Sequence, residues 1–162
     1  MIKRIFLLLV TFVFTLSVVS CSDGDTAFSY CELRIGLDED FYTVENENFD
    51  AVYSNGKYTV AILRISFVAA VSEGIPETMT PYEFGEFWIQ KCAREANLIK
   101  DGSVYCEYYD YGEDSEDGYF YLESFYRSAY AYFVILFAVD SDLEQAGRAD
   151  FLRYAESVNF TN

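Results

Sequence analysis

The dipeptide Asn55-Gly56 lies between two segments, 49–54 and 57–68, that are rich in aliphatic and aromatic residues. Asparagine followed by glycine favours a two-residue β-turn, because both central positions of that turn need a positive φ. The two flanking segments are therefore predicted to form an antiparallel β-hairpin. A hairpin at this position requires a fold that contains an antiparallel sheet.

Further segments show the β-branched and aromatic content of strands. Three of them are separated by short connections and are expected to form an antiparallel meander: Ser103 to Tyr111, Tyr119 to Arg127 and Tyr130 to Val139. An earlier strand is predicted at Cys31 to Leu37, and Ser157 to Phe160 is typical of a short closing strand. Together the segments predict an antiparallel sheet of about six strands.

Two main helices are predicted beside this sheet. Residues 80–83 (TPYE) have the form of a helix start, with a threonine cap, a proline in the first turn and a glutamate that completes a capping box. That helix is expected to run to about Asn97, and a second is expected to begin at Ser141 with Glu144 as its capping partner. The predicted class is α+β, an antiparallel sheet flanked by two helices.

The N-terminus has the profile of an export signal. Lys3 and Arg4 precede an apolar run from Ile5 to Val19. The run has 15 residues, whereas a transmembrane helix needs about 20 apolar residues to cross roughly 30 Å of hydrocarbon. Residues 1–20 are therefore expected to be a cleaved signal peptide.

The run ends in Val18-Val19-Ser20-Cys21, which resembles the lipobox of bacterial lipoprotein precursors. The resemblance implies that the Cys21 thiol receives a diacylglyceryl group and that Cys21 becomes the first mature residue. Two acyl chains hold a protein stably on a membrane. The alternative is an ordinary signal peptide followed by an incidental cysteine. The expected organisation is a signal peptide at 1–20, a lipidated cysteine and tether at 21–29, and one globular domain at 30–162, on the bacterial cell membrane and facing outside the cytoplasm.

Composition excludes some partners. Without Lys3 and Arg4, nine of the 11 basic residues remain against 27 acidic residues, so the mature chain has a formal charge of −18. Such a surface repels the phosphates of nucleic acids and anionic lipids, and no nucleic-acid partner is expected. An aromatic content of 19% and a hydrophobic content of 52% indicate a packed core rather than disorder.

Three cysteines, Cys31, Cys92 and Cys106, remain once Cys21 is assigned to the lipid. A disulfide between Cys92 and Cys106 is the predicted pairing, but Cys31 could replace either, and all three could instead be small buried thiols. The chain contains no histidine. Thiolate catalysis and Ser-His-Asp catalysis are therefore disfavoured.

The order of elements over nearly the whole mature chain resembles the Mog1/PsbP-like α/β domains. The matching features are residues 33–37 (LRIGL) before Asp40-Phe41, the hairpin, the capped helix from Thr80, the meander, and a closing helix with residues 155–160 (AESVNF). The resemblance implies a sheet flanked by helices and an accessory or binding role more often than an enzymatic one. It assigns no site residue, and another α+β sandwich is the alternative fold.

Acidic residues crowd the connection between the first two meander strands, where their carboxylates could bind Ca²⁺. Their spacing does not fit an EF-hand loop, because Ser124 stands where the bidentate glutamate belongs. A solvated turn without a metal is the alternative. The candidate ligands are Asp110, Glu113, Asp114, Glu116 and Asp117.

Tyrosines concentrate on the predicted meander. Alternate residues of a strand point to the same side, so Tyr119, Tyr121 and Phe125 should share one face. If the helices leave that face bare, these side chains would form a contact surface for a partner. The alternative is that the tyrosines only line a solvated face.

These features predict a monomeric, lipid-anchored cell-envelope protein that acts without a cofactor as a non-enzymatic binding or accessory module. Its expected partners are the membrane, through the anchor, and an envelope protein or glycan. One alternative is an envelope hydrolase whose two carboxylates face each other across a cleft. The other is a calcium-dependent binding domain.

Overall fold

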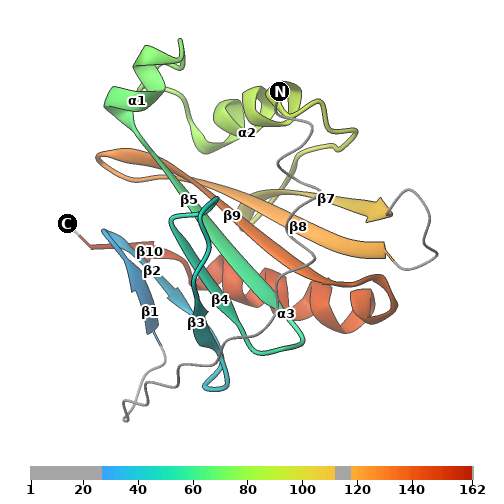
Figure 1. Cartoon of the computed structure of the whole chain (residues 1–162). Coiled ribbons are helices and arrows are strands. Elements are labelled where there is room, and N and C mark those ends of the chain that lie inside the picture. The colour runs from blue at the N-terminus through green and yellow to red at the C-terminus, as the bar shows by residue number, and fades with distance from the viewer. Residues whose placement is uncertain (1–26, 112–117, 162) are drawn as a thin grey trace.

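Antiparallel strands dominate the fold (Figure 1). The structure is a computed structural model that describes residues 27–111 and 118–161. Within these residues every neighbouring pair of strands is antiparallel. The main sheet contains, in spatial order, β3 (Tyr42–Val44), β4 (Ala51–Ser54), β5 (Thr59–Ser66), β9 (Ala131–Asp140), β8 (Gly118–Arg127), β7 (Ser103–Tyr111) and β6 (Ile99–Asp101). A smaller sheet contains β1 (Ala27–Tyr30), β2 (Leu33–Gly36) and β10 (Asn159–Phe160).

The predicted α+β class is confirmed, but the described part of the chain has ten strands rather than about six. The sequence pattern does not reveal β1, β3 and β6, because three or four residues carry too little alternation to identify a strand. Since β1 begins at Ala27, residues 27–29 belong to the folded domain and not to a tether. Phe28 fixes this strand, because its ring lies 4.7 Å from the ring of Tyr53.

The predicted hairpin is present, but its turn is wider than expected. Ser54 pairs with Thr59, so the connection has four residues, 55–58, instead of two. Only Gly56 has a positive φ in this connection, at 82°. The Asn55 side chain accepts hydrogen bonds from the backbone nitrogens of Lys57 and Tyr58, at 3.1 and 2.7 Å. These bonds satisfy the amides of the wider loop.

Three α-helices are described: α1 (Phe67–Ser72), α2 (Pro81–Lys91) and α3 (Glu144–Ser157). The capping box at the start of α2 is confirmed. Thr80 Oγ1 accepts a hydrogen bond from the Glu83 nitrogen at 3.3 Å, and the Glu83 carboxylate accepts one from the Thr80 nitrogen at 2.8 Å. No helix in the described ranges is long and apolar enough to cross a membrane.

Two other helix ends differ from prediction. α2 stops at Lys91 rather than Asn97, and Ala93 takes a left-handed conformation with φ 52° just beyond it. The capping box predicted at Ser141 is wrong. Residues 141–143 form a 3₁₀ turn instead, and α3 begins after Leu143 without a side-chain cap.

α2 and α3 cover opposite faces of the main sheet (Figure 1). Phe151 of α3 packs on the face that carries Phe120, where the two rings are nearly parallel. Phe84 of α2 packs on the other face, against Phe125 and Tyr132. Strand β8 therefore contributes to two separate core clusters, because its alternate residues point to opposite sides.

Candidate functional site

The predicted tyrosine surface divides between two environments. Tyr119 and Tyr121 are half-buried, whereas Phe125 is 1% exposed and lies beneath α2. A Cβ placed on Gly85 of α2 would come within 2.9 Å of the Phe125 ring, so the helix lies directly against the strand. The expectation that Phe125 faces a partner is therefore wrong. Strand periodicity identifies a face but not the part of it that a helix covers.

The opposite face of β7 carries a strip of exposed tyrosines. Glu107, Tyr109 and Tyr111 are alternate residues of the strand and point to the same side. Tyr109 is 44% exposed and Tyr111 is 56% exposed. Their rings are nearly parallel, with centroids 6.0 Å apart, and Tyr109 rests 5.6 Å from the buried ring of Phe120. The strip combines apolar ring faces with polar hydroxyls, as contact surfaces often do.

Helix α3 places charged groups beside this strip. Arg148 forms ion pairs with Glu107 at 2.7 Å and with Glu144 at 3.0 Å. Hydrogen bonding to Glu144 raises the pKa of Tyr109 to about 12. Burial raises the pKa of Glu107, and the nearby Arg148 counteracts part of this rise. We call Glu107, Tyr109, Tyr111, Glu144 and Arg148 the β7–α3 site.

The β7–α3 site presents two exposed tyrosine rings, as a contact surface does. An open hollow of about 400 Å³ at the start of α3 is lined by Asp142, Leu143, Gln145 and Ala146, none of which belongs to the β7–α3 site. Small-molecule sites are usually enclosed, whereas open surfaces suit macromolecular partners. Glu107 and Glu144 both form an ion pair with Arg148, so neither carboxylate is available as the acid or base that glycoside hydrolysis needs.

Sequence reasoning does not single out Tyr109 and Tyr111 in preference to the other tyrosines. Their alternation with Glu107 is visible in the sequence and marks a shared face. The contribution of Glu144 and Arg148 is not visible, because the fold alone brings α3 beside β7.

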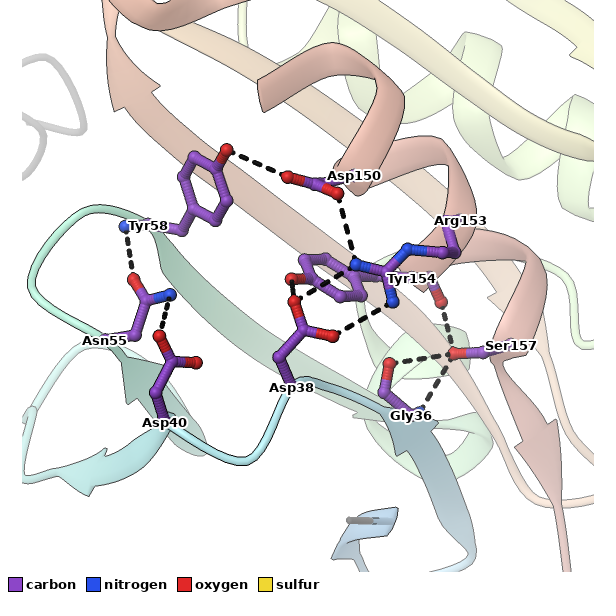
Figure 2. A network of polar contacts seen from close by, with 9 residues as sticks. All are labelled: Gly36, Asp38, Asp40, Asn55, Tyr58, Asp150, Arg153, Tyr154 and Ser157. Atoms are coloured by element: carbon purple, nitrogen blue, oxygen red, sulfur yellow. Dashed lines mark hydrogen bonds and ion pairs between the residues drawn. The ribbon is translucent and has the colours of Figure 1, made fainter. Parts of the chain in front are cut away.

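A second polar cluster joins α3 to two loops (Figure 2). Both terminal nitrogens of Arg153 contact the Asp38 carboxylate at 3.1 Å, and one also contacts Asp150 at 3.1 Å. The Tyr154 hydroxyl donates to Asp38 at 2.5 Å, and the Tyr58 hydroxyl donates to Asp150 at 2.9 Å. These hydrogen bonds and ion pairs hold the two loops against helix α3.

The calcium hypothesis falls mostly outside the described residues, where Glu113, Asp114, Glu116 and Asp117 lie. Asp110 is exposed near the end of β7. Across residues 27–111 and 118–161, no group of three or more His, Cys, Asp or Glu side chains could hold a metal ion. Calcium binding stays a prediction. Cys21 also lies outside the described residues.

The described cysteines carry free thiols in this structure. Cys31 is exposed, Cys92 is half-buried and Cys106 is buried. The expected bond between Cys92 and Cys106 is thus not formed here. Burial raises the pKa of Cys106 to about 12 and also raises that of Cys92, which keeps both sulfurs protonated. The pairing stays a prediction.

Comparison with known proteins identifies the fold. No family model matches the chain, and no curated protein sequence matches it. The solution structure of cyanobacterial PsbP from Synechocystis matches with a TM-score of 0.57 and 14% identity, over 90% of this chain and 99% of that chain. A crystal structure of a protein from Bacteroides thetaiotaomicron matches with a TM-score of 0.57 and 11% identity. It aligns with 86% of this chain, which spans about half of that protein's length (49%).

A further match is the crystal structure of LpqN, described as involved in cell envelope biogenesis of Mycobacterium tuberculosis. Its TM-score is 0.43 and its identity 8%, over 86% of this chain and 87% of that chain. At these identities the two matches with a TM-score of 0.57 establish the architecture alone. The chain therefore has a PsbP-like α+β fold.

Proposed function

We propose that this chain is a lipid-anchored cell-envelope protein that binds a partner through the β7–α3 site. The lipobox at Val18 to Cys21 supports the anchor. The exposed, parallel rings of Tyr109 and Tyr111 beside the charges of α3 are the observation that carries the binding role.

A cationic protein segment is the partner that fits this chemistry best. Arginine and lysine side chains bind over tyrosine rings. The mature chain has a formal charge of −18, and its described cations are largely engaged: Arg64, Lys91, Arg94, Arg148 and Arg153 all form ion pairs. A positively charged partner would be attracted over a long range, and the attraction would weaken with salt.

Binding of a fluorescent arginine-rich peptide to the mature protein tests the proposal. The double variant Tyr109→Ala/Tyr111→Ala should bind about tenfold more weakly, because two cation–π contacts contribute roughly 0.5 to 1 kcal/mol each. Its matched control is Tyr42→Ala/Tyr130→Ala, which removes two other exposed tyrosines, 55% and 62% exposed. The control should bind like the wild type.

Equal losses in both double variants would show that the peptide binds exposed tyrosines in general, and unchanged binding in both would show that it senses only the overall charge. Either result would overturn the assigned site. A parallel titration with soluble cell-wall glycan fragments separates the two partner classes. Glycan binding that depends on Tyr109 and Tyr111, without peptide binding, would replace the cationic partner by a glycan.

A further inference from the structure

The first strand fixes the point at which the chain enters the folded domain. Phe28 of β1 is packed between core aromatic rings, and the Tyr53 hydroxyl donates to the carbonyl of Ser29 at 3.4 Å. Ala27 pairs with Gly36 across β1 and β2. The Gly36 nitrogen in turn donates to Ser157 Oγ of α3 at 2.9 Å (Figure 2). Ala27 is thus held by β2 and, through Gly36 of β2, by α3.

Five residues, 22–26, separate Cys21 from Ala27 in the sequence. A fully extended chain advances at most about 3.3 to 3.6 Å per residue, so six steps reach no farther than about 22 Å. An anchor on Cys21 would therefore keep Ala27 within that distance of the lipid headgroups. This step rests on the lipid anchor proposed above.

The edge of the domain beside Ala27 consists of the residues that follow Gly36. Asp38, Glu39 and Asp40 are exposed there. The same edge includes the loop at 55–58, because Asn55 Nδ2 donates to Asp40 at 3.1 Å (Figure 2). We call residues 37–41 together with residues 55–58 the loop edge.

Helix α1 lies at the opposite end of the molecule (Figure 1). Strand β5 leads from the loop edge at Tyr58 to α1 at Phe67 through eight extended residues. At about 3.3 Å per residue this is a span of roughly 26 Å. Val68 of α1 is 85% exposed, which makes it a distant reference point.

We infer that the loop edge faces the lipid headgroups of the membrane that holds Cys21, and that α1 points away from it. The arrangement leaves the β7–α3 site open, because the C-terminal end of β7 and β1 lie on opposite sides of the molecule (Figure 1). The acidic residues of the loop edge repel anionic headgroups and are tolerated by zwitterionic ones. The domain should therefore keep this orientation most strictly on a zwitterionic membrane.

Fluorescence quenching on vesicles tests this orientation. The full lipidated protein carries Cys31→Ser and Cys92→Ser, and a fluorophore is attached through either Glu39→Cys or the matched distal variant Val68→Cys. The vesicles are phosphatidylcholine with a spin-labelled quencher lipid. Quenching at position 39 should exceed quenching at position 68 by at least about twofold, because quenching by a spin label is short-ranged and β5 spans roughly 26 Å between the two ends of the molecule. Replacing half of the phosphatidylcholine by phosphatidylglycerol should lower quenching at position 39, and high salt should restore it.

Mass spectrometry of the same samples separates the two proposals. A protein without lipid on Cys21 would overturn the anchor, and the orientation with it. Lipid on Cys21 combined with equal quenching at both positions, or with stronger quenching at position 68, would overturn the orientation alone.

Discussion

The indole nitrogen of Trp88 donates a hydrogen bond to Oε1 of Glu123 at 3.1 Å, which ties helix α2 to the middle of strand β8. The other carboxylate oxygen of Glu123 pairs with the guanidinium of Arg94. Glu123 is only 2% exposed. A carboxylate buried to this degree needs partners that compensate for the loss of water.

Removing Arg94 should therefore be costly. Arg94→Met leaves the charge of Glu123 without its cation and should lower the free energy of unfolding by about 3 to 5 kcal/mol. Arg94→Met/Glu123→Leu removes both charges and should recover much of that loss. Urea denaturation at neutral pH measures the difference. If the single variant loses less than about 1 kcal/mol, as exposed pairs do, the carboxylate is not desolvated in solution.

The helix-start motifs at Thr80 and Ser141 should respond differently when the first residue is replaced by alanine. Thr80→Ala removes a capping box that the structure contains, so it should destabilise the protein by about 1 kcal/mol. Ser141→Ala should have little effect, because Ser141 lies in a 3₁₀ turn and does not cap α3. Thermal unfolding of both variants provides the measurement. Equal destabilisation would mean that Ser141 caps α3 in solution.

This contrast shows what the sequence can and cannot reveal. The motif at Thr80 and the motif at Ser141 are alike in sequence, but only the first forms, because the backbone around the second follows a 3₁₀ turn. Long strands such as β8 and β9 are predictable, since their β-branched and aromatic residues extend over many positions. The burial of Phe125 and the pairing of Arg148 with Glu107 depend on where α2 and α3 dock, which local patterns do not contain.

The pair between Asp38 and Arg153 should make part of the stability depend on pH. Hydrogen bonds from Arg153 and Tyr154 hold the pKa of Asp38 below its usual value of 3.8. A lowered carboxyl pKa stabilises the fold at pH values above the unfolded-state pKa, and that contribution is lost as pH falls through the folded-state pKa.

Asp38→Asn should therefore lower the free energy of unfolding at pH 7, and the difference from wild type should shrink as the pH drops below 3.8. Because Asp38 is half exposed, the expected loss is about 0.5 to 1 kcal/mol. Urea denaturation over this pH range measures it. A difference that grows toward low pH would contradict the assigned interaction.

Thiol labelling should separate the cysteines by burial. In the native protein Cys31 should react with a maleimide first, and Cys106 should react only after unfolding, because burial raises its pKa to about 12. Peptide mass spectrometry after timed labelling gives the order. If Cys92 and Cys106 stay unlabelled even in denaturant until a reductant is added, the predicted disulfide exists in the exported protein.

Gly118 should control the position of the Tyr111 ring. A Cβ at Gly118 would lie 2.4 Å from that ring, so Gly118→Ala must displace it. The displaced ring is exposed and can move into solvent, so the stability cost should stay small, while binding of the arginine-rich peptide should weaken about threefold through the loss of one cation–π contact.

Gly74→Ala is the control for that experiment. Gly74 has a φ of 79° and no neighbour within 4 Å of an added Cβ. Alanine there should cost about 1 kcal/mol of stability through backbone strain and leave peptide binding unchanged. Gly118→Ala should thus weaken peptide binding with little loss of stability, whereas Gly74→Ala should lose stability without a change in peptide binding. Titration of the peptide measures the first effect and urea denaturation the second. Unchanged peptide binding by Gly118→Ala, together with lost binding by Tyr111→Ala, would show that the ring keeps its place despite the added methyl group.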